Sequence, residues 1–276
     1  MKFTLLLLVL LISHTSYANP IIYSLNDKEI ISEQRFIHSI RAVNHFVFGE
    51  FHYHKCIQDT EAYFIKIITD NRDREFTVGM EFINNDVQEE TDYWSIEYMS
   101  GAIGLRDFTF KLLGENSQNL RYSPILRETI LNNGELLGTN SPRDIKTKMI
   151  KDGYESIPDK YKTQDFYDGS NQYFERFKKA MEGHVGDEAL SKYFLAQVYT
   201  DNYIAEKFIE KKRYPIGIQI IGSFHSDYFD GFISQYSKRT NNPIISIKFV
   251  SKKDMDSIIK EPSRFGPVSH FLVGCE

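Results

Sequence analysis

Short apolar runs alternate with longer segments of helical periodicity along most of the chain. Apolar residues recur at helical spacing in segments such as 57–68, 120–131 and 190–211. The short runs have the near-continuous apolar character of strands covered on both faces; they are 46–48, 76–80, 135–138, 216–221 and 244–247. This alternation predicts an α/β fold with a mostly parallel central sheet flanked by helices.

The interval between the third and fourth predicted strands is too long for one crossover helix. Its clearest turn signal is Asp168-Gly169-Ser170-Asn171. We therefore expect a helical insertion at about 141–212. The sequence has no internal repeat and no low-complexity tract, which favours a single α/β domain over residues 19–276.

The amino terminus has the pattern of a secretory signal. Lys2 precedes the apolar run 5–12, and a small-x-small site ends at Ala18. The run is far shorter than the ~20 apolar residues that cross a bilayer, and no later segment predicts a transmembrane helix. We expect cleavage of residues 1–18 after Ala18 and a periplasmic or secreted protein.

Composition narrows the classes of partner. The formal net charge is −5, and no run of Lys or Arg forms a basic stripe, so nucleic-acid binding is not expected. The 21 Phe, 17 Tyr and one Trp suffice for a large core and for a pocket that takes a flat ligand. Composition does not decide between these two uses.

Cys56 and Cys275 are the two cysteines. In an oxidising compartment such a pair can close as a disulfide, here around a loop of about 220 residues with an entropic stabilisation of about 5 kcal/mol. The sequence gives no distance between the sulfurs. Two unlinked thiols are the default expectation, and the disulfide is the alternative.

Polar side chains follow four of the predicted strands. His52, Glu81, Asn140 with Arg143, and His225 stand at these strand ends, where ligands bind in parallel α/β sheets. Two imidazoles and a carboxylate can ligate a divalent metal that keeps an open position for water. Without a metal, they can act as a general base with its orienting carboxylate. Both alternatives stay open.

Glycine stands three residues before two of the histidines. Gly49 precedes His52 and Gly222 precedes His225, where the missing side chain would allow a sharp exit from the strand. One Gly-x-x-His motif is weak evidence for a functional site. Two copies, each directly after a strand-like run, favour such a site. His54 either extends this cluster or starts the next helix.

Gln197 and Asp201 lie four residues apart on one face of the predicted helix 190–211. The spacing alone favours a solvated face. The alternative is a helix that leans over the sheet edge and offers both side chains to a pocket.

Six motifs occur in one order over about residues 40 to 250; they are Gly49-Glu50-Phe51-His52, Gly79-Met80-Glu81, Tyr122-Ser123-Pro124-Ile125-Leu126, Asn140-Ser141-Pro142-Arg143, Ala196-Gln197 with Asp201 and Ala205, and Gly222-Ser223-Phe224-His225. In this order they resemble the ChaN-like haem-binding uptake proteins of the Tiki superfamily. The resemblance implies an α/β sheet with helical additions, and haem binding for iron acquisition at the bacterial envelope.

The resemblance also implies where haem is held. In ChaN-like proteins, haem lies at a subunit interface and a tyrosine ligates its iron, so a homodimer is expected. Tyr122 lies inside a family-like motif and is the candidate ligand. Asn140, Arg143, Gln197 and Asp201, in the other motifs, are the candidate residues around the cofactor.

The wider superfamily implies a second hypothesis, a metal-dependent hydrolase. Tiki proteases resemble this chain in the paired Gly-x-x-His motifs, and erythromycin-esterase-like proteins share Gly-Glu-x-His and a later Glu. This match implies catalytic roles for Glu50, His52, Glu81 and His225, with the last three as possible metal ligands. A third hypothesis is an envelope protein that keeps the fold without either activity.

Two positions depart from the family pattern. Tyr53 stands where the family often has Asp, and Phe224 stands where a second Gly is usual. These differences concern the fine geometry of the site and leave the fold assignment intact.

Overall fold

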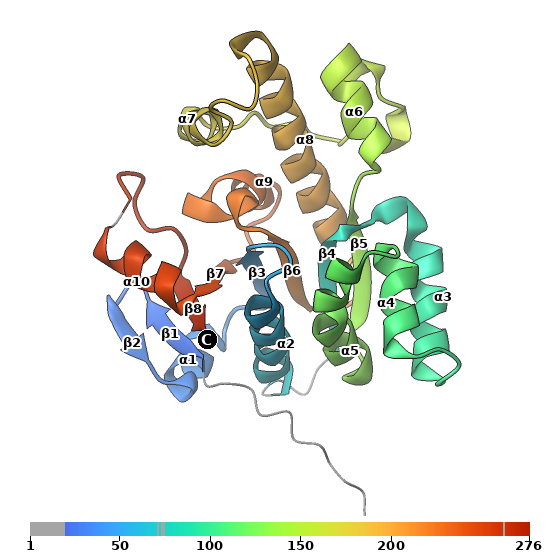
Figure 1. Cartoon of the computed structure of the whole chain (residues 1–276), viewed down its shortest axis with the longest axis vertical. Helices are drawn as coiled ribbons and strands as arrows, with labels where there is room; N and C mark the ends of the chain where they lie inside the picture. Colours follow the sequence, from blue (N-terminus) through green and yellow to red (C-terminus); the bar gives the residue numbers. More distant parts are fainter. Residues whose placement is uncertain (1–19, 71, 73–74, 262) are drawn as a thin grey trace, which may run out of the picture.

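The computed structural model describes residues 20–70, 72, 75–261 and 263–276, so the predicted signal segment 1–18 lies outside the described residues. Its strands form one eight-stranded sheet in the order β2-β1-β8-β7-β3-β6-β4-β5 (Figure 1). The strands are β1 (Ile21–Ser24), β2 (Glu29–Ile31), β3 (His45–Glu50), β4 (Phe76–Asn84), β5 (Glu135–Asn140), β6 (Ile216–Gly222), β7 (Ile244–Ser251) and β8 (Phe271–Cys275).

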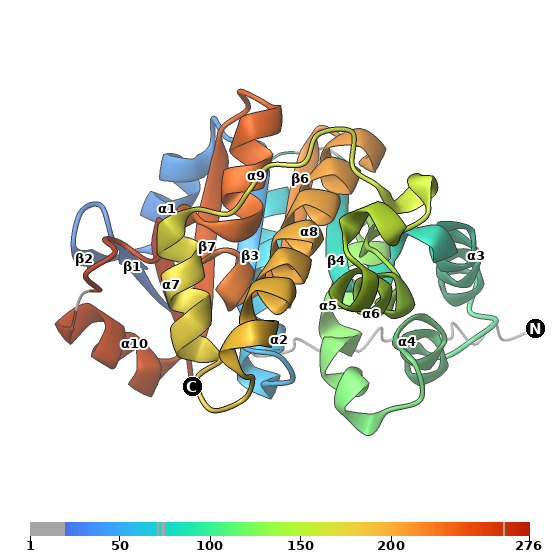
Figure 2. The same cartoon turned by 90° about the horizontal axis from the view of Figure 1, so that it is seen from above.

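Helices cover both faces of the sheet (Figure 2). Phe46 and Phe48 of β3 face a core formed with α1, α2, α4 and α5, whereas Val47 faces α8 and α9 on the other side. The helices are α1 (Glu33–Ile40), α2 (Lys55–Asp70), α3 (Gln88–Met99), α4 (Leu105–Leu113), α5 (Ser123–Leu131), α6 (Arg143–Asp152), α7 (Asn171–Ala180), α8 (Asp187–Lys211), α9 (Gly231–Arg239) and α10 (Lys252–Lys260).

The prediction of an α/β fold with a mostly parallel sheet is confirmed. All five predicted strands form, and they pair in parallel from β7 through β3, β6 and β4 to β5. The sequence did not predict β1, β2 and β8. The β1 strand pairs antiparallel with β2 and β8, so one end of the sheet is mixed.

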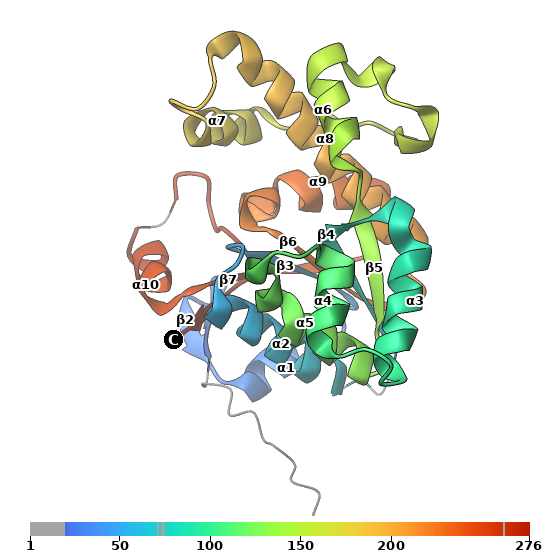
Figure 3. The same ribbon diagram turned by 45° about the vertical axis from the view of Figure 1, so that its right-hand side comes forward.

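Helices fill the interval between β5 and β6. α6, α7 and one end of α8 lie beyond the edge of the sheet (Figure 3). α8 has 25 residues, a length of about 37 Å at 1.5 Å per residue. It therefore reaches from this helical layer, where Tyr199 and Tyr203 pack with Ile145, to the sheet face, where Phe208 packs.

A disulfide joins the beginning of α2 to the end of β8. Cys56 and Cys275 are bonded, with their Cα atoms 5.7 Å apart and a sequence separation of 219. The default expectation of two unlinked thiols is therefore wrong. The sequence could not show this, because β8 was not predicted and its neighbour in space was unknown.

None of the helices in the described part of the chain combines the length and the apolar character that a bilayer span requires.

Candidate functional site

Four adjacent strands bring the predicted polar residues to one edge of the sheet. β3, β6, β4 and β5 are neighbours, and their carboxyl ends lead to His52, His225, Glu81 and Asn140 respectively. Because parallel strands end at the same edge, residues far apart in the chain come together there. We call His52, Glu81 and His225 with their buried partners Glu50 and Asp201 the strand-end cluster.

His225 is held by a carboxylate from the long helix. Its Nδ1 lies 2.7 Å from Oδ1 of Asp201, which is fully buried on α8, and its Nε2 lies 3.5 Å from Oε1 of Glu81. Tyr173 of α7 donates its hydroxyl hydrogen to the other Asp201 oxygen over 2.8 Å. Gln197 Nε2 lies 3.0 Å from the same Tyr173 hydroxyl.

His52 is held in the same way by a second buried carboxylate. Its Nδ1 lies 3.0 Å from Oε1 of Glu50, the last residue of β3. Tyr122 donates its hydroxyl hydrogen to that oxygen over 2.6 Å, and Gln58 of α2 donates to the other one. A buried acid therefore orients each imidazole through Nδ1. The Nε2 atom of each ring is left to bind a ligand or to transfer a proton.

Glu81 lies between the two imidazoles. Its Oε2 accepts the backbone N–H of Gly222 over 2.7 Å. A Cβ at residue 222 would come within 2.9 Å of the His52 ring and 3.5 Å of Glu81 Oε2. A side chain on residue 222 would therefore push these two groups away.

The two glycines serve close approach rather than a sharp turn. Gly222 has φ −54°, which other residues adopt readily. A Cβ at Gly49 would meet the Ser226 hydroxyl at 2.3 Å. The expectation that these glycines allow an unusual exit from the strand is wrong, because the constraint is the space between the two histidine loops.

The charges of the strand-end cluster stabilise one another. Burial lowers the pKa of His225, but the negative charges of Asp201 and Glu81 outweigh burial and raise it above the ordinary value. For His52, burial is likewise outweighed by the hydrogen bond to Glu50 and the charges of Glu81 and Glu50, which raise its pKa. Burial raises the pKa of Glu81, but the two imidazoles and the Gly222 N–H reverse this and lower it. Glu81 thus stays ionised beside two protonatable rings.

A second buried acid supports Glu50. Burial and the charge of Glu50 raise the pKa of Glu61 on α2 well above its ordinary value, which favours the neutral form of Glu61. Neither Glu61 oxygen accepts a hydrogen bond from another described residue. A protonated Glu61 resolves this, because its hydroxyl hydrogen can be shared with Glu50.

The structure brings some of the proposed haem-site residues to the cluster and leaves one outside. Asn140 donates its side-chain amide hydrogen to the Glu81 carbonyl over 2.9 Å. Gln197 and Asp201 contact His225, and Asp201 is completely buried. The expectation of a solvated face at these positions is wrong, since α8 crosses the sheet edge. Arg143 is exposed at the beginning of α6.

Tyr122 reaches the cluster from inside the core. Its side chain is fully buried, and its hydroxyl is bonded to Glu50. Burial and the charge of Glu50 raise the pKa of Tyr122 far above the ordinary value, which opposes formation of a phenolate. This position does not suit a ligand of haem iron, because the hydroxyl is neither exposed nor ionisable there.

The donor set has the chemistry of a divalent-metal site. Two imidazole Nε2 atoms and a carboxylate are metal ligands, and the acids on both Nδ1 atoms are typical outer partners. However, the ligand atoms of His52, Glu81 and His225 do not form a set within 4.8 Å of one another in the described chain. His54, Cys56 and Cys275 do, but those two sulfurs are bonded to each other. A metal at the strand-end cluster stays a prediction.

Sequence reasoning missed the partners that lie on helices. Gln58 and Glu61 are polar residues on the buried face of α2, and Tyr173 is a buried tyrosine of α7. The signal for the α2 pair was present, because Glu61 lies four residues from both Ile57 and Ile65, and Gln58 lies four residues before Ala62. Tyr173 lies four residues before Phe177, a spacing that indicates a buried face but not a contact with Asp201.

One family accounts for the order of these motifs along the chain. A sequence model described as "Haem-binding uptake, Tiki superfamily, ChaN" matches residues 36–235. The chain belongs to this family. The resemblance found in the six motifs is confirmed, and the matched range contains every residue of the strand-end cluster.

Solved structures extend the comparison to the fold. A ChaN of Campylobacter jejuni, solved with cofacial haem, is 16% identical and has a TM-score of 0.69; the match covers 93% of this chain and 97% of that chain. The type III effector HopBA1 is 10% identical with a TM-score of 0.49, covering 87% and 91%. The first similarity supports the same fold, and the second is too weak to carry an argument. Comparison with curated protein sequences finds no match.

Proposed function

We propose that this chain is an exported haem-binding protein that acts in haem or iron acquisition at the cell envelope. The observation that carries the proposal is the match of residues 36–235 to a haem-binding uptake family. The signal-like segment 1–18 supports export to the periplasm or the medium. The similar ChaN structure, described as binding haem cofacially, supports haem as the ligand, and a homodimer as the haem-bound form is part of the proposal.

A titration with hemin tests this function. We expect a saturable change of visible absorbance at a fixed ratio of hemin to protein. Tyr122→Phe should leave the saturation intact, because the hydroxyl it removes is bonded to Glu50 inside the core. Absence of saturation in the unchanged chain would contradict the function. Loss of saturation in Tyr122→Phe alone would instead restore this tyrosine as the ligand.

A second function, hydrolysis, is favoured by the oriented imidazoles. The imidazole ring of His225 lies between the carboxylates of Asp201 and Glu81. Sites that move protons during acyl transfer also place a histidine beside an acid. Glu81 is ionised and lies 3.5 Å from the ring. These residues can hold and transfer a proton at Nε2 of His225, either alone or beside a bound divalent cation.

Substitution of Glu81 tests hydrolysis directly. With nitrophenyl esters as the probe, we expect Glu81→Gln to lower any turnover by about 100-fold or more. The matched control is Glu89→Gln, which changes an exposed acid on α3 and should retain full activity. A chelator should reproduce the loss only if a metal takes part. Failure of the unchanged chain to exceed the uncatalysed rate would contradict this second function.

A further inference from the structure

His54 and the disulfide form a group of nitrogen and sulfur atoms outside the strand-end cluster. Nδ1 of His54 lies 3.4 Å from Sγ of Cys56, which is bonded to Sγ of Cys275. The imidazole nitrogen and the two sulfurs all lie within 4.8 Å of one another. Among the described residues, no other three His, Cys, Asp or Glu side chains bring their ligand atoms that close together.

The start of α2 fixes the positions of two of these three donors. The His54 carbonyl accepts the N–H groups of Ile57 and Gln58, over 2.8 and 3.2 Å, so His54 starts the helix rather than extending the strand-end cluster. Cys56 is the second residue of α2, where the positive end of the helix dipole stabilises a thiolate. The imidazole and the first sulfur are therefore carried by one ordered turn of backbone.

The third donor comes from the last strand of the sheet. Cys275 ends β8 and is 5% exposed, whereas Cys56 is half-buried and His54 is exposed. A small reductant therefore reaches the disulfide from the side of Cys56. The Cα atoms of the two cysteines are 5.7 Å apart. Two thiolates on a tetrahedral zinc ion lie about 3.8 Å apart, which rotation of the side chains reaches from this backbone separation.

Two thiolates and one imidazole are the donors that zinc prefers in proteins. Soft thiolates and imidazoles bind Zn²⁺ in tetrahedral geometry, whereas Mg²⁺ and Ca²⁺ take oxygen ligands. A site with three protein ligands keeps its fourth position for water. The group around the disulfide therefore has the composition of a zinc site once its two sulfurs are separate thiolates.

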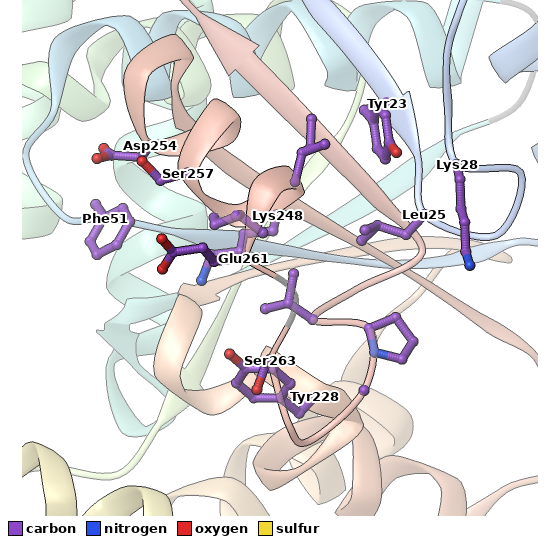
Figure 4. A pocket seen from close by; sticks show the side chains of 15 residues that line it. Tyr23, Leu25, Lys28, Phe51, Tyr228, Lys248, Asp254, Ser257, Glu261 and Ser263 are labelled. Atoms are coloured by element: carbon purple, nitrogen blue, oxygen red, sulfur yellow. The ribbon is translucent and has the colours of Figure 1, made fainter.

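The apolar cavity next to the same loop offers a metal no comparable set of donors. It has a volume of about 670 Å³, and Phe51, three residues before His54, belongs to its lining (Figure 4). The carboxylates in this lining are those of Asp254 and Glu261. Within the part of the chain that the structure describes, they belong to no set of three ligand atoms within 4.8 Å. A metal held by thiolates is therefore held outside this cavity.

We propose that His54, Cys56 and Cys275 form a zinc site when the disulfide is reduced, with a water molecule at the fourth position. The reductant is a dithiol. It passes two electrons and two protons to the cysteine sulfurs as their bond breaks, and it closes its own disulfide. The two thiols release their protons to solvent as two zinc–sulfur bonds form, and the neutral imidazole supplies the third bond through Nδ1. Zinc binding here does not depend on the proposed haem function.

Cobalt(II) tests the donor set, because its visible spectrum reports both thiolate ligands and tetrahedral geometry. We expect the reduced full chain to bind Co²⁺ with a thiolate-to-cobalt band and tetrahedral bands, which added zinc removes. A phosphine reductant opens the disulfide without adding competing thiols. The chain with its disulfide closed should show neither kind of band. Cobalt at the strand-end cluster would give no thiolate band, because that cluster contains no sulfur.

Single substitutions assign the three ligands. Cys56→Ser, Cys275→Ser and His54→Ala should each weaken zinc binding by about tenfold or more. Even a partner of a ligand is worth about 10–100-fold in metal affinity, so a direct ligand is worth at least as much. The matched control is His38→Ala, which removes an exposed imidazole of α1 and should leave zinc binding unchanged. Full zinc affinity in His54→Ala or in either cysteine variant would overturn the site.

Stability measurements test the same site in a chain that reduction weakens. Zinc should raise the denaturant midpoint of the reduced chain, because an ion that binds the folded form stabilises it. The rise should exceed that of the double variant Cys56→Ser/Cys275→Ser. If the reduced chain is unfolded without zinc, added zinc should restore its folded circular dichroism spectrum. An equal effect of zinc on the reduced chain and on the double variant would overturn the proposal.

Discussion

Replacement of Glu50 with alanine is expected to lower the free energy of unfolding by about 3–5 kcal/mol, the usual cost of removing one member of a buried charged network. The Glu50 carboxylate is 1% exposed and accepts hydrogen bonds from Tyr122, Gln58 and His52. Without it, the buried Tyr122 hydroxyl loses its acceptor, and the Gln58 amide keeps only the Phe51 carbonyl, 3.2 Å away. Denaturant unfolding followed by circular dichroism measures the change.

Tyr122→Phe is the matched control for Glu50→Ala. It removes one donor and leaves Glu50 bonded to Gln58 and His52, so a loss of about 1 kcal/mol is expected. Equal losses in the two variants would show that the carboxylate does not organise its neighbours.

The effect of Glu50→Ala should also depend on pH. The pKa of His52 is raised in the folded chain above its ordinary value of 6.5, so protonation of His52 stabilises the fold. This stabilisation is complete below the unfolded pKa and is lost as the pH rises through the folded pKa. The stability difference between the unchanged chain and Glu50→Ala should therefore be larger at about pH 6 than at about pH 9. A stability difference that grows as the pH rises would contradict the conclusion that protonation of His52 stabilises the fold.

Loss of the disulfide is expected to destabilise the chain by up to about 5 kcal/mol, the chain-entropy value for a closed loop with a sequence separation of 219. Cys56→Ser, Cys275→Ser and the double variant should show the same loss, since each breaks the same bond. A reducing agent should lower the stability of the unchanged chain by a similar amount. The measurement is denaturant unfolding with and without the reductant.

The double cysteine variant controls for side effects of the reductant, which should not change its stability. If the unchanged chain is equally stable with and without reductant, the bond makes no contribution and the prediction fails.

The central sheet was predictable because of how its strands are buried. β3, β4, β6 and β7 lie inside the sheet and β5 lies at its edge. Helices cover the sheet on both faces, so these strands are apolar on both sides and their runs are nearly continuous. β2 and β1 are three and four residues long, too short for a periodic signal. β8 has five residues, and its partner β1 is far away in sequence.

The strand-end cluster was predictable in part for the same reason. His52, Glu81 and His225 follow predicted strands, and parallel strands end at one edge. The burial of Asp201 depends instead on the path of α8 across that edge, which is a property of tertiary packing. The role of Tyr122 could not be read from its motif, because a tyrosine before Ser-Pro has the same sequence whether its hydroxyl faces a buried acid or a ligand.

The position of β8 inside the sheet has a consequence for folding during synthesis. Its residues 271–275 insert between β1 and β7, although β1 leaves the ribosome some 250 residues before β8 does. Until then the β1–β2 hairpin has no partner strand, and an isolated hairpin is barely stable in water. This end of the sheet is therefore assembled after the rest of the chain has been made, and such long-range pairing is slow.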